Sequence, residues 1–153
     1  MSDWILGELD IDQERAIYPT LSLEQLLASQ WYSEYFTEIR DMQNGYVWYT
    51  FQNVPISSQL FSLSLLFQSS VLNMVIMSVS DAKYGQSWDD WTEEKELQRK
   101  QQHDAFLNKE LQRQPDVRRW KPYPYIEYKV AYGRIQSSYD PRSASSSISI
   151  TYA

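Results

Sequence analysis

Hydrophobic and polar residues alternate through the middle of the chain. Residues 51–80 contain no Asp, Glu, Lys or Arg. On both sides of Ser69-Ser70, apolar side chains recur at every second position or close to it: Phe61, Leu63, Leu65 and Phe67, then Val71, Val75, Met77 and Val79. A period of two is typical of strands with one buried face. This segment therefore predicts two central strands joined at Ser69-Ser70. A membrane span is disfavoured because Pro55 and many Gln, Asn and Ser side chains interrupt it.

A second hairpin is predicted just upstream. Asn44-Gly45 separates residues 35–42 from an aromatic run at 46–51. Asn-Gly is a strong two-residue hairpin signal, because both positions tolerate positive φ. Four consecutive strands with short connections predict an antiparallel meander.

Two helices are predicted. Residues 22–29 form a short one, with Ser22 as the N-cap and leucines on one face. A long helix is expected from about Trp88 to Gln114, capped by Ser87 with Asp90 and ended by Pro115. Its narrow apolar stripe consists of Leu97, Phe106, Leu107 and Leu111. One face should therefore pack on the sheet, with the rest in water.

Two further strands are expected near the C-terminus, at residues 126–139 and 146–152, with a turn over 140–143 between them. Prolines make residues 120–125 a rigid connection. The chain thus predicts a single domain over residues 1–153. We expect an α+β fold: a mostly antiparallel sheet of five to seven strands, one long helix packed on one face, and a short N-terminal helix.

Composition removes several classes of chemistry. The 153 residues include no cysteine and one histidine, so disulfides, thiol nucleophiles and thiolate zinc sites are excluded. Glycine-rich phosphate loops and nucleophile elbows are absent. We therefore expect no cofactor and no metal. The first twenty residues lack the pattern of a signal peptide, which favours a cytoplasmic protein.

Charge is unevenly distributed along the chain. The net charge is −6, with nine acids and two bases in residues 1–50 and three acids and six bases in residues 115–153. An acidic chain repels polyanions, so nucleic acid is not an expected partner, and neither is a membrane. Oligomeric state is not fixed by the sequence.

Two features could carry catalysis. Residues 88–96 hold a dense acid cluster, including Asp89, Asp90 and Glu96, and His103 follows on the same predicted helix. Paired carboxylates or a carboxylate beside a histidine could perform acid-base chemistry. Acids are also ordinary at a helix start, where they complement the dipole, and a lone histidine is more often buried and hydrogen-bonded. No catalytic residue is assigned.

Aromatic residues gather next to acids in the N-terminal third. Such a mixture is typical of a binding surface for a protein or for sugar rings, although both sheet faces could also be covered. We predict a partner-binding surface made of Trp31, Tyr35, Tyr46, Trp48, Glu34, Glu38 and Asp41.

Residues from about 45 to 152 resemble a family of small uncharacterised bacterial α+β proteins. The resemblance is carried by Trp88-Asp89-Asp90-Trp91, by His103-Asp104 and by residues 133–143. In size, acidity and aromatic content the chain is also similar to immunity proteins, which are small acidic domains that block a bacterial toxin by binding it. These resemblances imply no catalytic residues.

The leading functional hypothesis is a non-enzymatic bacterial interaction protein, such as an immunity protein that neutralises a basic toxin domain. The alternatives are a small hydrolase-like enzyme that uses the helix carboxylates and His103, and an aromatic-lined module that binds a carbohydrate or another small ligand. The sequence favours binding over catalysis without deciding between them.

Overall fold

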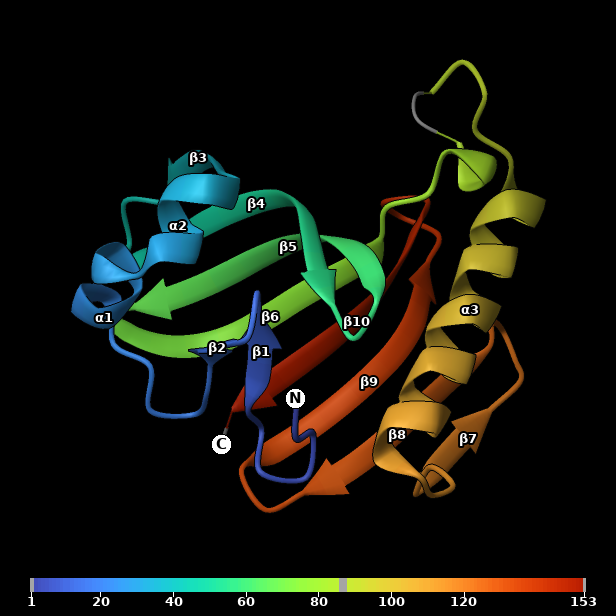
Figure 1. Ribbon diagram of the computed structural model, residues 1–153. Coiled ribbons are helices and arrows are strands. Elements are labelled where there is room, and N and C mark those ends of the chain that lie inside the picture. The colour runs from blue at the N-terminus through green and yellow to red at the C-terminus, as the bar shows by residue number, and fades with distance from the viewer. Residues whose placement is uncertain (1, 86–87, 153) are drawn as a thin grey trace.

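A computed structural model describes residues 2–85 and 88–152. Its main feature is an antiparallel sheet of eight strands (Figure 1). In spatial order these are β3 (Phe36–Asp41), β4 (Tyr46–Ile56), β5 (Gln59–Gln68), β6 (Val71–Val79), β10 (Ser145–Tyr152), β9 (Gly133–Asp140), β8 (Tyr125–Val130) and β7 (Val117–Arg119). The other elements are the hairpin β1 (Leu9–Ile11) and β2 (Glu14–Ile17), and the helices α1 (Leu23–Ala28), α2 (Gln30–Tyr35), η1 (Ala82–Tyr84) and α3 (Glu93–Leu111).

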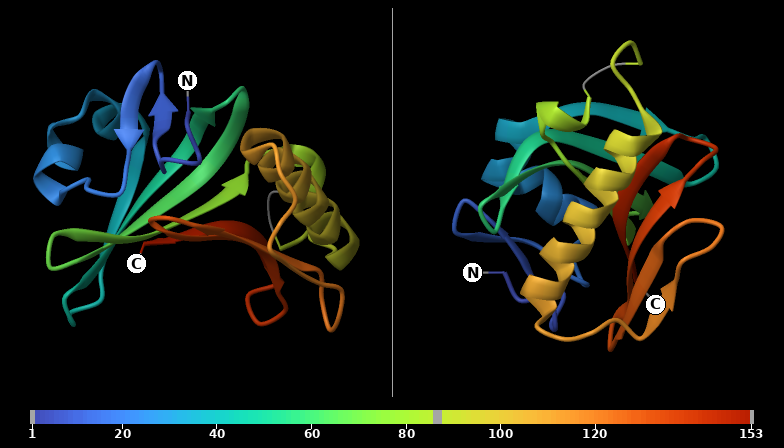
Figure 2. Two further views of the ribbon diagram at one scale, coloured as in Figure 1. Left: turned by 90° about the horizontal axis from the view of Figure 1, so that it is seen from below. Right: turned by 90° about the vertical axis from the view of Figure 1, so that its right-hand side faces the viewer.

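The helices and the β1–β2 hairpin all lie on one side of the sheet (Figure 2). α3 packs against β10, β9 and β6, whereas α2 and β1 pack against β4. The buried core lies between these elements and the sheet. We call the opposite side the uncovered face, because Figure 2 shows no described helix over it. The expected α+β class, antiparallel sheet and long helix on one face are therefore confirmed.

The predicted meander from β3 to β6 is also confirmed. Met42 N–H donates to Tyr46 O across the Asn44-Gly45 turn, at 3.0 Å. Ser69 and Ser70 both have positive φ, 49° and 69°, as a tight hairpin turn requires. Local turn chemistry and alternation were sufficient to predict these four strands.

One detail of the predicted hydrophobic pattern is wrong. Val71 was expected on the buried face but is 66% exposed, whereas Leu72 is only 3% exposed. The register between β5 and β6 shifts between Leu66 and Phe67, so that Phe67 pairs with Leu72 and Leu66 pairs with Met74. This bulge reverses the direction of side chains at the start of β6.

The short helix is confirmed and the long one begins later than predicted. Ser22 and Gln25 form a reciprocal capping box at α1. α3 begins at Glu93, because the Thr92 side chain accepts a hydrogen bond from Lys95 N–H and caps the helix there. The N-cap predicted for the long helix, Ser87, lies outside the described residues. Among the described residues, no helix combines the length and apolar character needed to cross a bilayer.

The sheet has more strands than the five to seven predicted. Residues 126–139, predicted as one strand, form the β8–β9 hairpin, which turns at Ala131-Tyr132. β7 was not predicted, and the small β1–β2 hairpin and α2 were also missed. The first residue of β9 must be glycine, since a Cβ on Gly133 would lie 1.9 Å from Thr151 O.

Candidate functional site

The strand β3 forms one edge of the large sheet, and within the described chain its outer side pairs with no strand. After Phe36, all of its residues are exposed. Ile39 is 52% exposed, and Met42, just beyond the strand, is exposed as well. We call the outer side of β3 the β3 edge.

The alternation of hydrogen-bonded pairs between β3 and β4 shows which backbone groups at the β3 edge are free to bond to an added strand. Met42 N–H bonds to Tyr46 O, and in an antiparallel ladder the bonded pairs alternate. Arg40, opposite Trp48, therefore directs its N–H and C=O toward β4. Ile39 and Asp41 direct theirs away from the sheet, where an added strand could bond to them.

Acidic side chains surround this edge. Glu34 on α2 and Glu38 and Asp41 on β3 are all exposed. Arg40 is the single Lys or Arg between residues 16 and 80. The local charge is therefore negative, as the uneven charge distribution predicted.

The predicted partner-binding residues do not form one continuous surface. Glu38, Tyr46 and Trp48 lie on the uncovered face, because they alternate with the buried residues Tyr49 and Phe51. Asp41 projects to the other side of β3. The sheet itself therefore separates Asp41 from Glu38 and the two aromatic side chains.

Two of the predicted aromatics are engaged by other parts of the chain, Trp31 in the core and Tyr35 at intermediate burial. The ring of Trp31 is 1% exposed and packs against Phe51, with ring centroids 4.6 Å apart, so the structure places it in the core and away from any surface. The hydroxyl of Tyr35 donates to Asp12 Oδ2 at 2.5 Å. This hydrogen bond is the main reason that the pKa of Tyr35 is raised to about 12. Sequence reasoning missed α2, whose helical turn directs Trp31 inward.

The second candidate site, on α3, consists of buried polar residues. Glu96, Lys100 and His103 lie on the helix face toward the sheet and are each at most 3% exposed. Val79 N–H donates to His103 Nε2 at 3.0 Å. Burial is the main reason that the pKa of His103 falls to about 3. His103 is therefore a neutral acceptor in the core, which confirms its structural interpretation.

Lys100 occupies an unusual position for an ammonium group. Its side chain is 1% exposed, and Nζ lies 2.7 Å from both carboxylate oxygens of Asp104. Burial lowers the pKa of Lys100, while the hydrogen bonds to Asp104 oppose that shift. The pair satisfies a buried charge and leaves this lysine little access to a substrate.

The acid cluster before α3 is exposed. Asp89, Asp90, Glu93 and Glu94 all face solvent. Glu93 and Glu94 occupy the first turn of the helix, where acids complement the helix dipole. No group of three potential metal ligands occurs among the described residues.

Comparisons of the chain with protein-family models, with curated proteins and with solved structures give no match. The resemblances noted from the sequence therefore stay predictions.

Proposed function

We propose that this chain is a non-enzymatic interaction protein that binds a basic protein through the β3 edge, as an immunity protein would bind a toxin domain. The observation that carries the proposal is an open, exposed edge strand bordered by acids. In this proposal, a strand of the partner pairs with Ile39 and Asp41, and its basic side chains meet Glu34, Glu38 and Asp41.

The contrast between the two ends of the sheet supports this choice. β7, the opposite edge, has three residues and lies between Pro115 and Pro122. Short edges and nearby prolines are common ways to prevent strand addition. β3 has six residues and no proline, so it lacks these two protective features.

The positions of the helix residues favour binding over the hydrolase alternative. A general acid or base must be able to reach its substrate and change protonation near working pH. His103 is fully buried, and its pKa of about 3 keeps it neutral. Glu96 is also buried, and both of its oxygens accept hydrogen bonds.

The test uses the backbone of β3. The source organism's lysate would supply a partner, which must be identified, purified and shown to be basic before binding is measured. Ile39→Pro removes an outward N–H that makes no bond to β4, so the sheet should persist while strand addition is blocked. Ile39→Val is the matched control, because it keeps the N–H and a similar side chain.

We expect Ile39→Pro to weaken binding by at least about tenfold, equivalent to about one backbone hydrogen bond. Ile39→Val should bind like the parent protein. Circular dichroism and urea unfolding establish that both variants are folded. Equal affinity of the two variants, or an acidic partner, would overturn the proposed mode of binding.

A further inference from the structure

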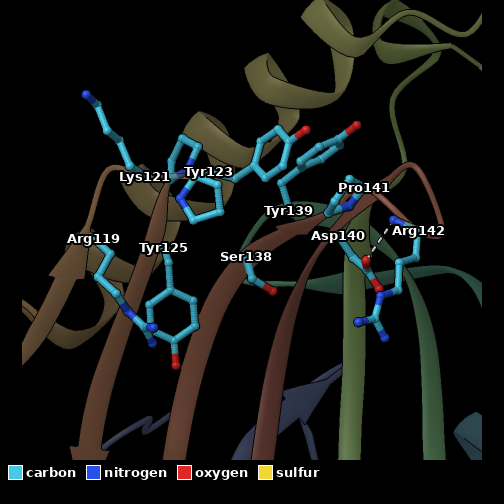
Figure 3. Close-up of a pocket in the computed structure, with 11 residues that line it drawn as sticks. Arg119, Lys121, Tyr123, Tyr125, Ser138, Tyr139, Asp140, Pro141 and Arg142 are labelled. Atoms are coloured by element: carbon cyan, nitrogen blue, oxygen red, sulfur yellow. Dashed lines mark hydrogen bonds between the residues drawn. The ribbon is translucent and has the colours of Figure 1, made fainter.

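A pocket lies at the opposite end of the sheet from β3, where β7, β8 and β9 meet the turn after β9. Its volume is about 390 Å³, which is within the range of small-molecule sites. Figure 3 shows Ser138 in the middle, with Arg119 and Tyr125 on one side and Arg142 on the other. We call it the Arg119–Arg142 pocket.

The sheet register explains why these side chains gather. Arg119 of β7 is opposite Tyr125 of β8, and Tyr125 is opposite Ser138 of β9. Residues directly opposite in neighbouring strands project to the same face. All three therefore lie in one row on the uncovered face.

The turn after β9 completes the pocket. Asp140 Oδ1 accepts a hydrogen bond from Arg142 N–H at 2.9 Å, which fixes the backbone of the turn. The side chains of Tyr123 and Tyr139 lie above this row in Figure 3, with ring centroids 4.9 Å apart. The Tyr139 ring points toward α3, where its hydroxyl donates to Glu93.

The pocket is electropositive. Three of the four charged residues that line it are bases, Arg119, Lys121 and Arg142, and the fourth is Asp140. In the described structure, none of these bases forms an ion pair with a carboxylate. Lys121 points away from Ser138 in Figure 3, so the two guanidinium groups provide most of the positive charge near the hydroxyl.

The nearest acid on the β8 strand is already engaged. Glu127 Oε1 accepts from the Tyr125 hydroxyl at 2.6 Å and from Gln136 Nε2 at 3.2 Å. These hydrogen bonds hold the pKa of Glu127 below its usual range and also fix the Tyr125 ring. The guanidinium carbon of Arg119 lies 4.2 Å from the centroid of that ring. Arg119 is therefore stacked while its N–H groups stay available to a ligand.

We propose that the Arg119–Arg142 pocket binds a small ligand that carries a phosphate or carboxylate on a flat ring, with the chemistry of an aryl phosphate or a nucleoside monophosphate. The anionic group lies between the two guanidinium groups and accepts a hydrogen bond from Ser138. The flat ring packs on the Tyr125 ring and on the prolines that line the pocket. This site is independent of the proposed β3 edge, which lies at the other end of the sheet.

A nucleic-acid strand is the competing occupant, since Trp120 nearby is 69% exposed and Arg118 lies over its ring. Exposed aromatics among bases can stack successive nucleotides. The pocket volume of about 390 Å³ matches a small ligand, and the net charge of −6 disfavours a polyanion. The two occupants can be separated in one experiment.

The experiment is calorimetric titration of the full chain at low salt with adenosine monophosphate, phenyl phosphate, benzoate, inorganic phosphate and a short single-stranded oligonucleotide. Arg119→Gln and Arg142→Gln each remove one guanidinium group. Arg119→Lys keeps the charge but not the planar fork. Arg134→Gln is the matched control, because Arg134 is an exposed arginine on β9 outside the pocket.

We expect at least one of the three ring-bearing anions to bind more tightly than inorganic phosphate. Arg119→Gln and Arg142→Gln should each weaken that binding by about tenfold or more, which corresponds to one lost charge-assisted hydrogen bond. The affinity of Arg119→Lys should lie between those of the parent and Arg119→Gln. Arg134→Gln should bind with the affinity of the parent. The order of affinity among adenosine monophosphate, phenyl phosphate and benzoate would show which anionic group and which ring the pocket prefers.

Several results would overturn the proposal. One is the absence of any heat of binding with the ring-bearing anions at concentrations up to about 10 mM, which would mean that the affinity is negligible. A second is an equal loss of affinity in Arg134→Gln, which would indicate diffuse attraction. A third is binding of the oligonucleotide alone, with a steep salt dependence, which would assign the surface to nucleic acid.

Discussion

Glu96 of α3 binds Ser146 of β10 through two hydrogen bonds, from the backbone N–H at 3.0 Å and from Oγ at 2.9 Å. Continuing the register of β6 and β10 places Val79 of β6 opposite Ser146, and the Val79 N–H donates to His103 Nε2. The ladder between these strands begins only at Ile148 and Met77. Side chains from α3 therefore take over backbone hydrogen bonds where the two strands stop pairing. This arrangement explains why a core-facing helix carries polar residues.

The first prediction concerns the acceptor on His103. His103→Leu should lower the free energy of unfolding by about 1–3 kcal/mol, because it leaves the buried Val79 N–H without its partner. His103→Gln is the control, since its side-chain oxygen can accept the same bond and should retain more of the stability. Urea unfolding measures both. Equal stability of the leucine variant and the parent would contradict this role.

The second prediction concerns pH and follows from the same residue. The pKa of His103 is lowered from 6.5 to about 3 in the folded state, chiefly by burial. Between these values the unfolded chain binds a proton that the folded chain does not. Stability should therefore fall as pH decreases from about 6.5 toward 3, with a slope of at most about 1.4 kcal/mol per pH unit from this group.

Because His103 is the one histidine in the sequence, the comparison is direct. The stability difference between the parent and His103→Gln should change between pH 6.5 and 4.5 in favour of the variant. Carboxylates titrate similarly in both proteins, so their contributions largely cancel in the stability difference. A difference that does not vary with pH would show that the histidine titrates normally.

Residues of the β3–β6 meander could be predicted because their signals are local. Alternation and the turns at Asn44-Gly45 and Ser69-Ser70 depend only on neighbouring residues. The β8–β9 turn at Ala131-Tyr132 uses neither Asn-Gly nor proline, so residues 126–139 gave the pattern of one strand. Gly133 was the one local signal of this turn. Position 133 requires glycine because of the close approach of Thr151, which is distant in the sequence.

Positions that depend on tertiary contacts could not be predicted. Glu96 has the sequence pattern of a solvent-facing helix residue, yet it faces the sheet and bonds to Ser146 where β6 and β10 end their pairing. Trp31 was assigned to a surface because α2 was not recognised. Acids near β3 were identified from composition, but the open edge beside them depends on the strand order.

The third prediction concerns the apolar part of α3. Leu107 is fully buried on the face of α3 that packs on the sheet. Leu107→Ala should cost about 2–5 kcal/mol of stability, through lost contacts and a residual cavity. Gln101→Ala, on the exposed side of α3, should change stability by no more than about 0.5 kcal/mol. A melting temperature of Leu107→Ala equal to that of the parent would contradict the packing.

The fourth prediction concerns Gly133. Its φ of 149° is rare for residues with a side chain, and its missing Cβ makes room for the Thr151 carbonyl. Gly133→Ala should therefore destabilise the β9–β10 pair and lower the melting temperature by several degrees. The comparison is Gly45→Ala, where an added Cβ approaches no atom closer than Ser69 Oγ at 3.9 Å and only backbone strain remains. A smaller effect at Gly133 than at Gly45 would contradict this account.

The last prediction separates charge from packing in the proposed interaction with a basic partner. Charges near an interface mainly accelerate association, whereas packed aromatic side chains mainly slow dissociation. Asp41→Lys should therefore lower the association rate and flatten its dependence on salt. Glu94→Lys, the same charge change on an exposed residue of α3, should have less effect. Trp48 is half-buried on the uncovered face beside Arg40, so Trp48→Ala should speed dissociation while leaving the salt dependence of association unchanged. Stopped-flow or surface-based kinetics would measure both rates as the screening length falls from about 30 to about 10 Å. Equal effects of the two lysine variants would contradict steering by the β3 edge, and an unchanged dissociation rate for Trp48→Ala would remove Trp48 from the interface.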